Sequence, residues 1–205
     1  GQAWLSVVGF RLSGLRINPI SWMPWPSFWE INLRTYVKDK QGKKGVWFYS
    51  LDSSDIFAVL GARLMYGLPY NFSLTEGSVS SNQITFRSRR KLPHARARSE
   101  FGASFAPIQS GTEFSGSTLD HFLLERYRFW ARRKWATLST TARVRHSPYQ
   151  AVRTQVTHYK GELFSSQGLA EPTQEATLGH YCKGLKVHAS APSWAFSIAG
   201  QANHR

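Results

Sequence analysis

The chain has 205 residues, of which 41% are hydrophobic and 14% aromatic; its formal net charge is +14, and it contains one cysteine, Cys182. This composition excludes an intrinsically disordered chain, and a single cysteine excludes an internal disulfide and a cysteine-rich zinc site. The apolar runs are far shorter than the roughly 20 residues that a transmembrane helix needs. We therefore predict one folded, cytoplasmic domain with no membrane span and no signal peptide.

The first quarter of the chain predicts three strands, at residues 3–12, 29–37 and 46–51. Prolines in 18–27 predict a loop before the second strand, and the Lys- and Gly-rich stretch 38–45 predicts a hairpin turn after it. In the second strand apolar and polar side chains alternate with a period of two, which places them on opposite faces. The polar face consists of Glu30, Asn32, Arg34 and Tyr36.

A helix is predicted after the third strand, from an apolar stripe at helical spacing. The stripe consists of Ile56, Val59, Leu60 and Leu64. Asp52 or Ser53 is the predicted N-cap, and Asp55 suits the positive end of the helix dipole. Gly67 at the C-terminal end, followed by Pro69, predicts where this helix stops.

The rest of the chain predicts further strands and one more helix. The strands are expected at 71–76, 83–90, 96–105, 136–145, 152–159 and 179–188. The second helix is expected after the loop 107–116, because Ser117 and Asp120 have the spacing of a capping box. Its apolar side would consist of Leu119, Phe122, Leu123, Tyr127 and Trp130. Residues 189–205 are small and polar, which predicts a flexible tail.

Many strands with two interspersed helices predict an α+β, β-rich fold. We expect an antiparallel barrel or sandwich with the two helices packed on it, formed as a single domain by residues 1–188.

One segment points to a family. Residues 61–71 (GARLMYGLPYN), with the preceding strand 45–52, resemble the acetoacetate-decarboxylase superfamily, in which a Tyr-Leu-Asp-like strand end feeds a helix that closes in Gly-aromatic-Pro-Lys-Lys. The chain is more closely similar to the YqjF-like branch, a family of uncharacterised function, over residues 1–188. The matching stretches are 32–37, 45–52, 61–70, 86–90, 122–127 and 180–181. The resemblance implies the acetoacetate-decarboxylase-like fold, in a family that usually opens with a further segment before Gly1.

The chain departs from the decarboxylases at the lysine that forms their Schiff base. By the resemblance, this position falls on Tyr70, and the lysine beside it falls on Asn71. A lysine amine attacks a keto group only when it is neutral, and neither tyrosine nor asparagine can form an imine or act as the perturbing cation. The other lysines are expected in solvent. The resemblance therefore implies that the protein is not an acetoacetate decarboxylase, and the sequence leaves open whether it is an enzyme.

The polar face of the second strand supplies the candidate site. Tyr70 and Glu30 are the candidate catalytic residues, because the decarboxylases line their cavity with a glutamate from the strand that corresponds to that of Glu30. The ligand-binding candidates are Arg34, Asn32, Arg63, Tyr49 and Asn71. An arginine can clamp a carboxylate bidentately, which predicts a polar anionic or carbonyl-bearing ligand. Alternatively, this face is exposed to solvent, Glu30 and Arg34 pair with each other, and Arg63 forms a structural salt bridge.

Two basic clusters keep a second function open, that of a non-catalytic module that binds nucleic acid or another polyanion. The clusters are Arg87, Arg89, Arg90, Lys91, Arg96 and Arg98, and then Arg126, Arg128, Arg132, Arg133 and Lys134. Aromatic residues interleave with the second cluster, but at helical spacing they belong to a core. We expect no cofactor and no metal site, since neither the pair His121 and Glu125 nor the pair His180 and Cys182 has an evident third ligand.

Overall fold

The computed structural model describes residues 3–18, 22–23, 25–80, 83–91, 98–107, 118–132 and 139–195. Within these ranges the chain forms mostly β-strands. The strands are β1 (Leu5–Leu12), β2 (Phe28–Lys38), β3 (Lys44–Ser53), β4 (Tyr70–Val79), β5 (Ile84–Arg90), β6 (Glu100–Pro107), β7 (Arg128–Arg132), β8 (Ser139–Arg145), β9 (Ala151–Gly161), β10 (Gly179–Cys182), β11 (His188–Ala189) and β12 (Ser193–Ala195). The helices are α1 (Ile56–Tyr66), α2 (Thr118–Leu124) and the short 3₁₀ helix η1 (Ser165–Gln167).

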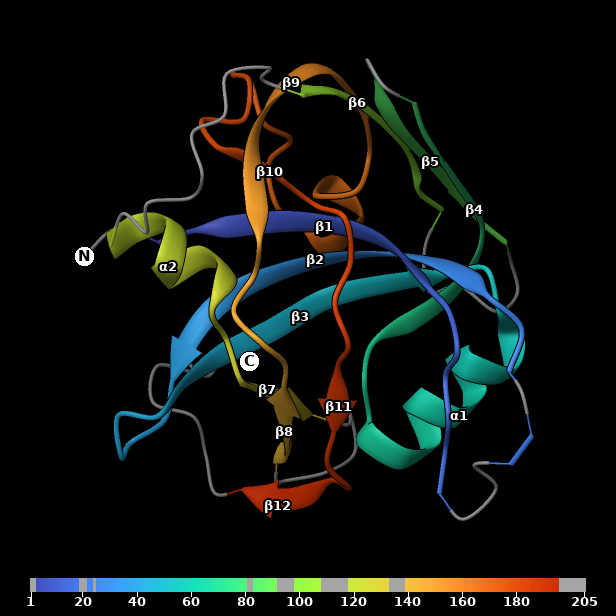
Figure 1. Ribbon diagram of the computed structural model, residues 1–205, viewed down its shortest axis with the longest axis vertical. Coiled ribbons are helices and arrows are strands. Elements are labelled where there is room, and N and C mark those ends of the chain that lie inside the picture. The colour runs from blue at the N-terminus through green and yellow to red at the C-terminus, as the bar shows by residue number, and fades with distance from the viewer. Residues whose placement is uncertain are drawn as a thin grey trace.

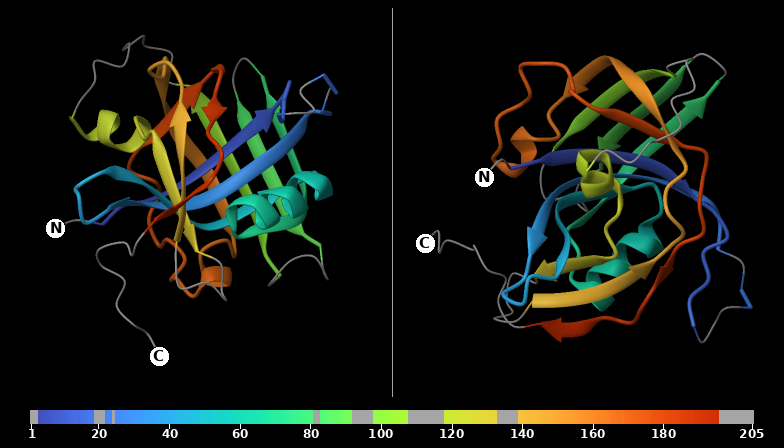
Figure 2. Two further views of the ribbon diagram at one scale, coloured as in Figure 1. Left: turned by 90° about the horizontal axis from the view of Figure 1, so that it is seen from below. Right: turned by 60° about the vertical axis from the view of Figure 1, so that its left-hand side comes forward.

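The sheet divides in two at β3. Strands β1, β2 and β3 form an antiparallel centre, and β3 then shares its other edge between two strands. Residues 51–53 pair with β4, and residues 46–47 pair with β7. From β4 the order continues through β5, β6, β9 and β10, and from β7 it continues to β8, which pairs with both β11 and β12. Figures 1 and 2 show these two groups of strands diverging on either side of the long central strands.

The β-rich fold with two α-helices is confirmed, but the closed antiparallel barrel is not. The described strands form one mixed sheet in which β3 runs parallel to β4 and to β7, and β10 and β11 remain at opposite ends of the strand order. The physical reason lies in α1. A helix between two adjacent strands is a crossover connection, which returns the chain to the end of the sheet where it started, so that the next strand runs parallel.

Helix α1 begins later than predicted. Its N-cap is Asp55, whose carboxylate accepts a hydrogen bond from the backbone N–H of Ala58 at 2.7 Å. The prediction that Asp52 or Ser53 caps the helix is therefore wrong, since both are the last residues of β3. No α-helix among the described residues is long and apolar enough to cross a lipid bilayer.

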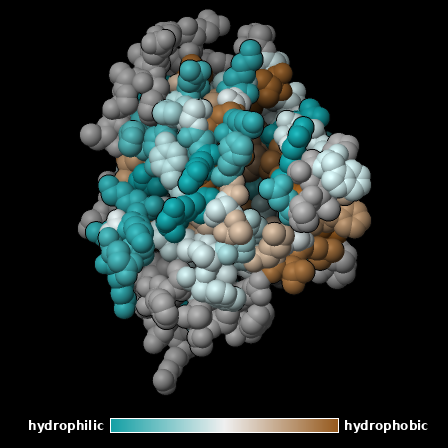
Figure 3. Space-filling view, turned by 60° about the horizontal axis from the view of Figure 1, so that its bottom comes forward, coloured by the Kyte–Doolittle hydropathy of each residue, from teal (hydrophilic) through white to brown (hydrophobic). Residues whose placement is uncertain are grey.

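The predicted apolar stripe of α1 is only partly buried. Val59 is inaccessible to solvent, whereas Leu60 and Leu64 are 49% and 74% exposed. The helix contacts β3 and β4 along one narrow side, so it covers the sheet with fewer positions than its apolar residues offer. The space-filling view shows a hydrophobic patch at the lower right of the face turned forward, next to hydrophilic residues (Figure 3).

Gly67 ends α1 as predicted, in the left-handed conformation with φ 71° and with its N–H donating to the carbonyl of Arg63 at 3.1 Å. We expect Gly67→Ala to lower the free energy of unfolding by about 1 kcal/mol, because a Cβ disfavours this conformation. Gly61 is the matched control, since it lies inside α1 with open space around it. Gly61→Ala should raise the free energy of unfolding by about 0.5–1 kcal/mol. Urea denaturation measures both; changes of the same sign would contradict the assignment.

A first core lies between the central strands and the group β4, β5, β6 and β9. It is built from one face of β2, from the inner faces of β5 and β6, and from the segment before η1. Its buried members are Ile31, Leu33, Ile84, Phe86, Phe101, Ala103, Leu163 and Phe164. Every second side chain in and just before β6 is buried, namely Ser99, Phe101 and Ala103.

A second core lies between the opposite face of β3 and the group β7 and β8. Its buried members are Val46, Leu51, Leu68, Phe129, Ala131 and Ala142. This arrangement corrects the second predicted helix, which ends at Leu124 and does not include Trp130. In β7, side chains alternate between two faces, and Trp130 is buried on the face opposite Phe129. Tyr127 and Trp130 continue the helical spacing of the apolar residues before them, so the sequence of β7 was predicted as part of the helix.

The end of the chain also contributes to this second group of strands. Within the range predicted as a flexible tail, residues 193–195 form β12, which pairs antiparallel with β8 at Thr141, Thr140 and Ser139. This short segment pairs through its backbone with an available strand edge, which composition does not reveal.

Candidate functional site

The predicted polar face of β2 lies against the second core. Glu30, Asn32, Arg34 and Tyr36 stand opposite Ser53, Leu51, Phe48 and Val46 of β3, respectively. A β-bulge at the Leu33/Arg34 step accommodates Tyr49 and keeps the four side chains on one face. Glu30 and Asn32 are only 2% and 3% exposed. The alternative in which this face is open to solvent therefore does not hold for its first two members.

Glu30 and Tyr70 form a buried pair. The Tyr70 hydroxyl donates to the carboxylate oxygen Oε2 of Glu30 at 2.8 Å, and the side chain of Asn32 is a further hydrogen-bond partner of this carboxylate. Burial raises the pKa of Glu30 from 4.5 to about 7, although the hydrogen bond from Tyr70 favours the charged form. Burial and the neighbouring carboxylate raise the pKa of Tyr70, which stays a protonated donor. Glu30 can therefore exchange a proton near neutral pH.

Arg34 does not pair with Glu30, and its surroundings include a second arginine. The guanidinium carbons of Arg34 and Arg126 lie 6.0 Å and 5.5 Å from the ring centroid of Tyr36. Arg126 also stacks over Phe122 at 4.1 Å. The Tyr36 hydroxyl donates to the carbonyl of Leu123 at 3.1 Å and accepts from the Ser6 hydroxyl at 2.6 Å, which joins β2 to the end of α2.

Both arginines have buried N–H groups without a hydrogen-bond partner among the described residues: Nε of Arg34, and Nε and Nη2 of Arg126. The nearby carboxylate of Glu125 is engaged elsewhere, since it accepts hydrogen bonds from the Tyr127 hydroxyl and from the backbone N–H of Tyr149. Burial, together with the charge of Arg34, lowers the pKa of Arg126. Two positive charges with unpaired N–H donors favour the binding of an anion at this place.

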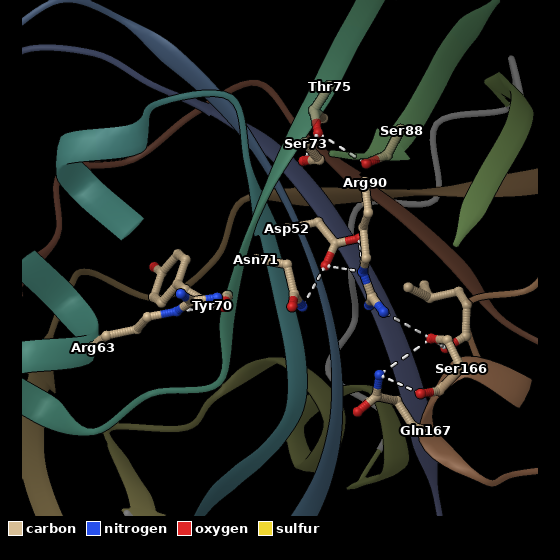
Figure 4. A network of polar contacts seen from close by, with 11 residues as sticks. Asp52, Arg63, Tyr70, Asn71, Ser73, Thr75, Ser88, Arg90, Ser166 and Gln167 are labelled. Atoms are coloured by element: carbon tan, nitrogen blue, oxygen red, sulfur yellow. Dashed lines mark hydrogen bonds and ion pairs between the residues drawn. The ribbon is translucent and has the colours of Figure 1, made fainter. Parts of the chain in front are cut away.

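A second polar network lies on the opposite face of β3, inside the first core (Figure 4). The Arg90 Nε donates to both carboxylate oxygens of Asp52 at 2.9 Å, and the Asn71 amide donates to Oδ1 at 3.1 Å. Arg90 Nη1 donates to the hydroxyl of Ser166 at 2.9 Å. Burial raises the pKa of Asp52, and Arg90 offsets part of this rise. The Arg90 and Asp52 side chains are 0% and 2% exposed, so the pair is fully desolvated.

Hydroxyl groups continue this network along β4 and β5. The Ser73 and Thr75 hydroxyls lie 2.6 Å apart, and that of Thr75 lies 2.9 Å from that of Ser88. All three are buried. The alternation of small polar residues in β4 is the sequence signal for this row, and it was not among the predicted site features.

The remaining candidates fall on different sides of the sheet. Tyr70 and Asn71 are consecutive in β4 and point to opposite faces, so that Asn71 belongs to the Asp52 network and not to Glu30. Tyr49 packs against the first core. The Arg63 guanidinium donates to the backbone carbonyl of Tyr70, through Nε at 2.8 Å, and ties α1 to β4. The structure therefore brings together Glu30, Asn32 and Tyr70, with Arg34 farther along the same face.

No lysine among the described residues is buried, so none of them lies in the desolvated setting that an imine-forming lysine uses. The first basic cluster is divided: Arg87 and Arg89 are exposed on β5, and Arg90 is buried with Asp52. Arg96, Arg133 and Lys134 lie outside the described residues. His180 bonds to Asp120 at 2.9 Å, and Asp120 also pairs with Arg153. In the described part of the chain no group of three His, Cys, Asp or Glu residues is arranged to hold a metal ion.

Comparison with known proteins gives a family and a fold. The model of the DUF2071 family, described as an uncharacterized conserved protein, matches residues 1–186. The uncharacterized protein YqjF of Bacillus subtilis (strain 168) is 32% identical over 188 residues, which are 91% of this chain and 75% of that protein. The crystal structure of acetoacetate decarboxylase from Legionella pneumophila has a TM-score of 0.59 at 9% identity, over 86% of this chain and 70% of that chain. This last likeness concerns the fold alone, and the predicted resemblance is confirmed.

Proposed function

Since the chain belongs to the DUF2071 family of uncharacterized conserved proteins, on an acetoacetate-decarboxylase-like fold, we propose that it binds a small anionic compound between Arg34 and Arg126. The observation that carries this proposal is the set of three buried, unpaired N–H groups on two neighbouring guanidinium groups. Buried donors without a hydrogen-bond partner are costly in the free protein, and a carboxylate or phosphate oxygen would satisfy them with charge-assisted hydrogen bonds.

The rest of the β2 face supports a ligand with a polar body. Asn32 lies between Glu30 and Arg34, and its Oδ1 is buried without a hydrogen-bond partner. It could accept a hydrogen bond from a ligand whose anionic end lies at Arg34. Glu30 is four residues from Arg34, which is roughly 13 Å along a strand. A ligand that contacts both residues therefore has to be extended, with its carbonyl or hydroxyl end toward Glu30.

Acid–base chemistry without an imine is the reaction type that this face supports. Glu30, with a pKa of about 7, is present in both protonation states at neutral pH, which suits proton exchange with a carbonyl compound. Tyr70 takes the position that the decarboxylases give to their Schiff-base lysine, as the resemblance implies. Acetoacetate and related keto acids are the ligand class to test first, because the similar solved structure is named for that substrate.

We expect Arg34→Met to weaken the binding of a keto acid about 10- to 100-fold, the range expected for losing a charge-assisted hydrogen bond. Isothermal titration calorimetry with acetoacetate and with pyruvate measures this. Folding should not suffer, since the variant relieves repulsion between two cations. Arg87→Met, on the exposed face of β5, is the matched control.

Two outcomes would contradict the proposal. One is equal affinity of Arg34→Met and the wild type for every keto acid that binds. The other is a stable lysine adduct after borohydride reduction in the presence of the keto acid, since this would require an imine that the proposed site cannot form.

A further inference from the structure

A groove of about 960 Å³ lies on the outer face of β7 and β8, away from the second core. Arg128 and Trp130 of β7 and Thr141 and Arg143 of β8 line it together, on the face opposite Phe129 and Ala142. The β2–β3 turn forms one side, and the segment that contains β11 and β12 forms the other. The turn contributes Asp39, Gln41 and Lys43, and the other side includes His188 and Trp194, while Arg145 lines the groove from the end of β8.

The lining of this groove is strongly cationic. It contains Lys43, Arg128, Arg143 and Arg145, and among the residues that line it Asp39 is the sole carboxylate. That carboxylate is engaged in its own turn, because its Oδ1 accepts the backbone N–H groups of Gln41 and Lys43 at 3.0 and 2.8 Å. None of the four cations forms a salt bridge with any residue of the described chain.

Two of the cations face each other across the strand pair. Arg128 is directly opposite Arg143 in the antiparallel register of β7 and β8. Like charges in this position are destabilising, since the side chains of directly opposed residues lie close together. Two residues farther along β8, Arg145 stands opposite His188 of β11. The strand period places Arg143 and Arg145 on the same face, about 7 Å apart. Positive charge therefore forms a short row at the C-terminal end of β8.

An exposed aromatic residue lies at the edge of this groove. Trp194 lines the groove from β12, and its residue surface is 62% exposed. An exposed indole ring offers a stacking platform, and bases stack on aromatic side chains regardless of their identity.

We propose that this groove binds single-stranded nucleic acid, with phosphates along Arg143 and Arg145 and a base stacked on Trp194. A half-open groove with a row of cations and a bordering aromatic ring combines the two features that sequence-independent single-strand binding uses. An acidic peptide would use the cations and leave the indole without a matching group. The site is separate from the Arg34–Arg126 pair, which lies on the other side of β2 and β3 from this outer face.

The test is fluorescence anisotropy with a labelled oligothymidylate of about 12 nucleotides, which is within the usual range of single-strand site sizes. The full chain should bind at about 50 mM salt, and the logarithm of the affinity should fall linearly with the logarithm of the salt concentration, with a slope of about −0.7 per phosphate contact. The double variant R143Q/R145Q should bind at least about tenfold more weakly, with a slope shallower by about 1.4. Trp194→Ala should lose at least about fivefold.

The matched control is R87Q/R89Q, which removes the same charge from an exposed face of β5 and should bind like the wild type. R143Q/R145Q should keep or raise the melting temperature, since it removes a repulsive pair. Equal losses in both double variants would overturn the proposal in favour of a general charge effect. Absence of binding at low salt, or binding of adenosine monophosphate but not of the oligonucleotide, would overturn it too. Arg34→Met should bind the oligonucleotide normally, so this test is independent of the proposed small-molecule function.

Discussion

Arg90→Leu is expected to lower the free energy of unfolding by about 3–5 kcal/mol, because it leaves the Asp52 carboxylate buried without its countercharge. Asp52 is 1% exposed, and the remaining Asn71 amide can replace only part of the lost interaction. The Ser166 hydroxyl also loses the hydrogen bond that it accepts from Arg90, which loosens the link between β5 and η1. Urea denaturation at neutral pH measures the change.

Two further variants separate this effect from simple loss of an arginine. Arg89→Leu removes the neighbouring, exposed arginine of β5 and should change stability by less than about 0.5 kcal/mol. The double variant D52L/R90M should recover part of the loss, since replacing both members of a buried ion pair leaves no unpaired charge. A loss below about 1 kcal/mol for Arg90→Leu would show that water reaches Asp52 and that the network is not desolvated.

The Asp52–Arg90 ion pair is a contact that local sequence patterns could not predict. The sequence assigned Asp52 to a helix cap and Arg90 to a surface cluster, because each assignment uses only neighbours within a few residues. The pair joins residues separated by 38 positions, and only the path from β3 through α1 to β5 brings them together. Charge runs are usually solvated, so a buried member of a run cannot be recognised from composition.

The period of two along a β-strand predicted more of the candidate site. The alternation in β2 correctly placed Glu30, Asn32, Arg34 and Tyr36 on one face, since a period of two is a property of the extended backbone itself. The same rule separates Tyr70 from Asn71, once β4 is known to begin at Tyr70 rather than one residue later. Arg126 was missed as the neighbour of Arg34, because the predicted helix extended through it and gave it a different direction.

The second large effect is expected from pH. Burial raises the pKa of Glu30 from 4.5 to about 7, so between these values the folded state holds a proton that the unfolded chain has released. Stability falls with rising pH wherever the native state binds more protons. The contribution of Glu30 is fully present below about pH 4.5 and is lost as the pH rises to about 7. The shift corresponds to about 3 kcal/mol.

Glu30→Gln isolates this contribution, because the amide is neutral at every pH while histidines and other carboxylates titrate equally in both proteins. We expect the stability of the variant relative to the wild type to increase by about 3 kcal/mol between pH 4 and pH 8, as measured by urea denaturation across that range. In Tyr70→Phe the fall in the free energy of unfolding should extend to higher pH than in the wild type, since the Tyr70 hydroxyl stabilises the charged carboxylate of Glu30. Parallel pH profiles for Glu30→Gln and the wild type would mean that Glu30 ionises as in water, and that proton exchange near neutral pH is no basis for its role beside Tyr70.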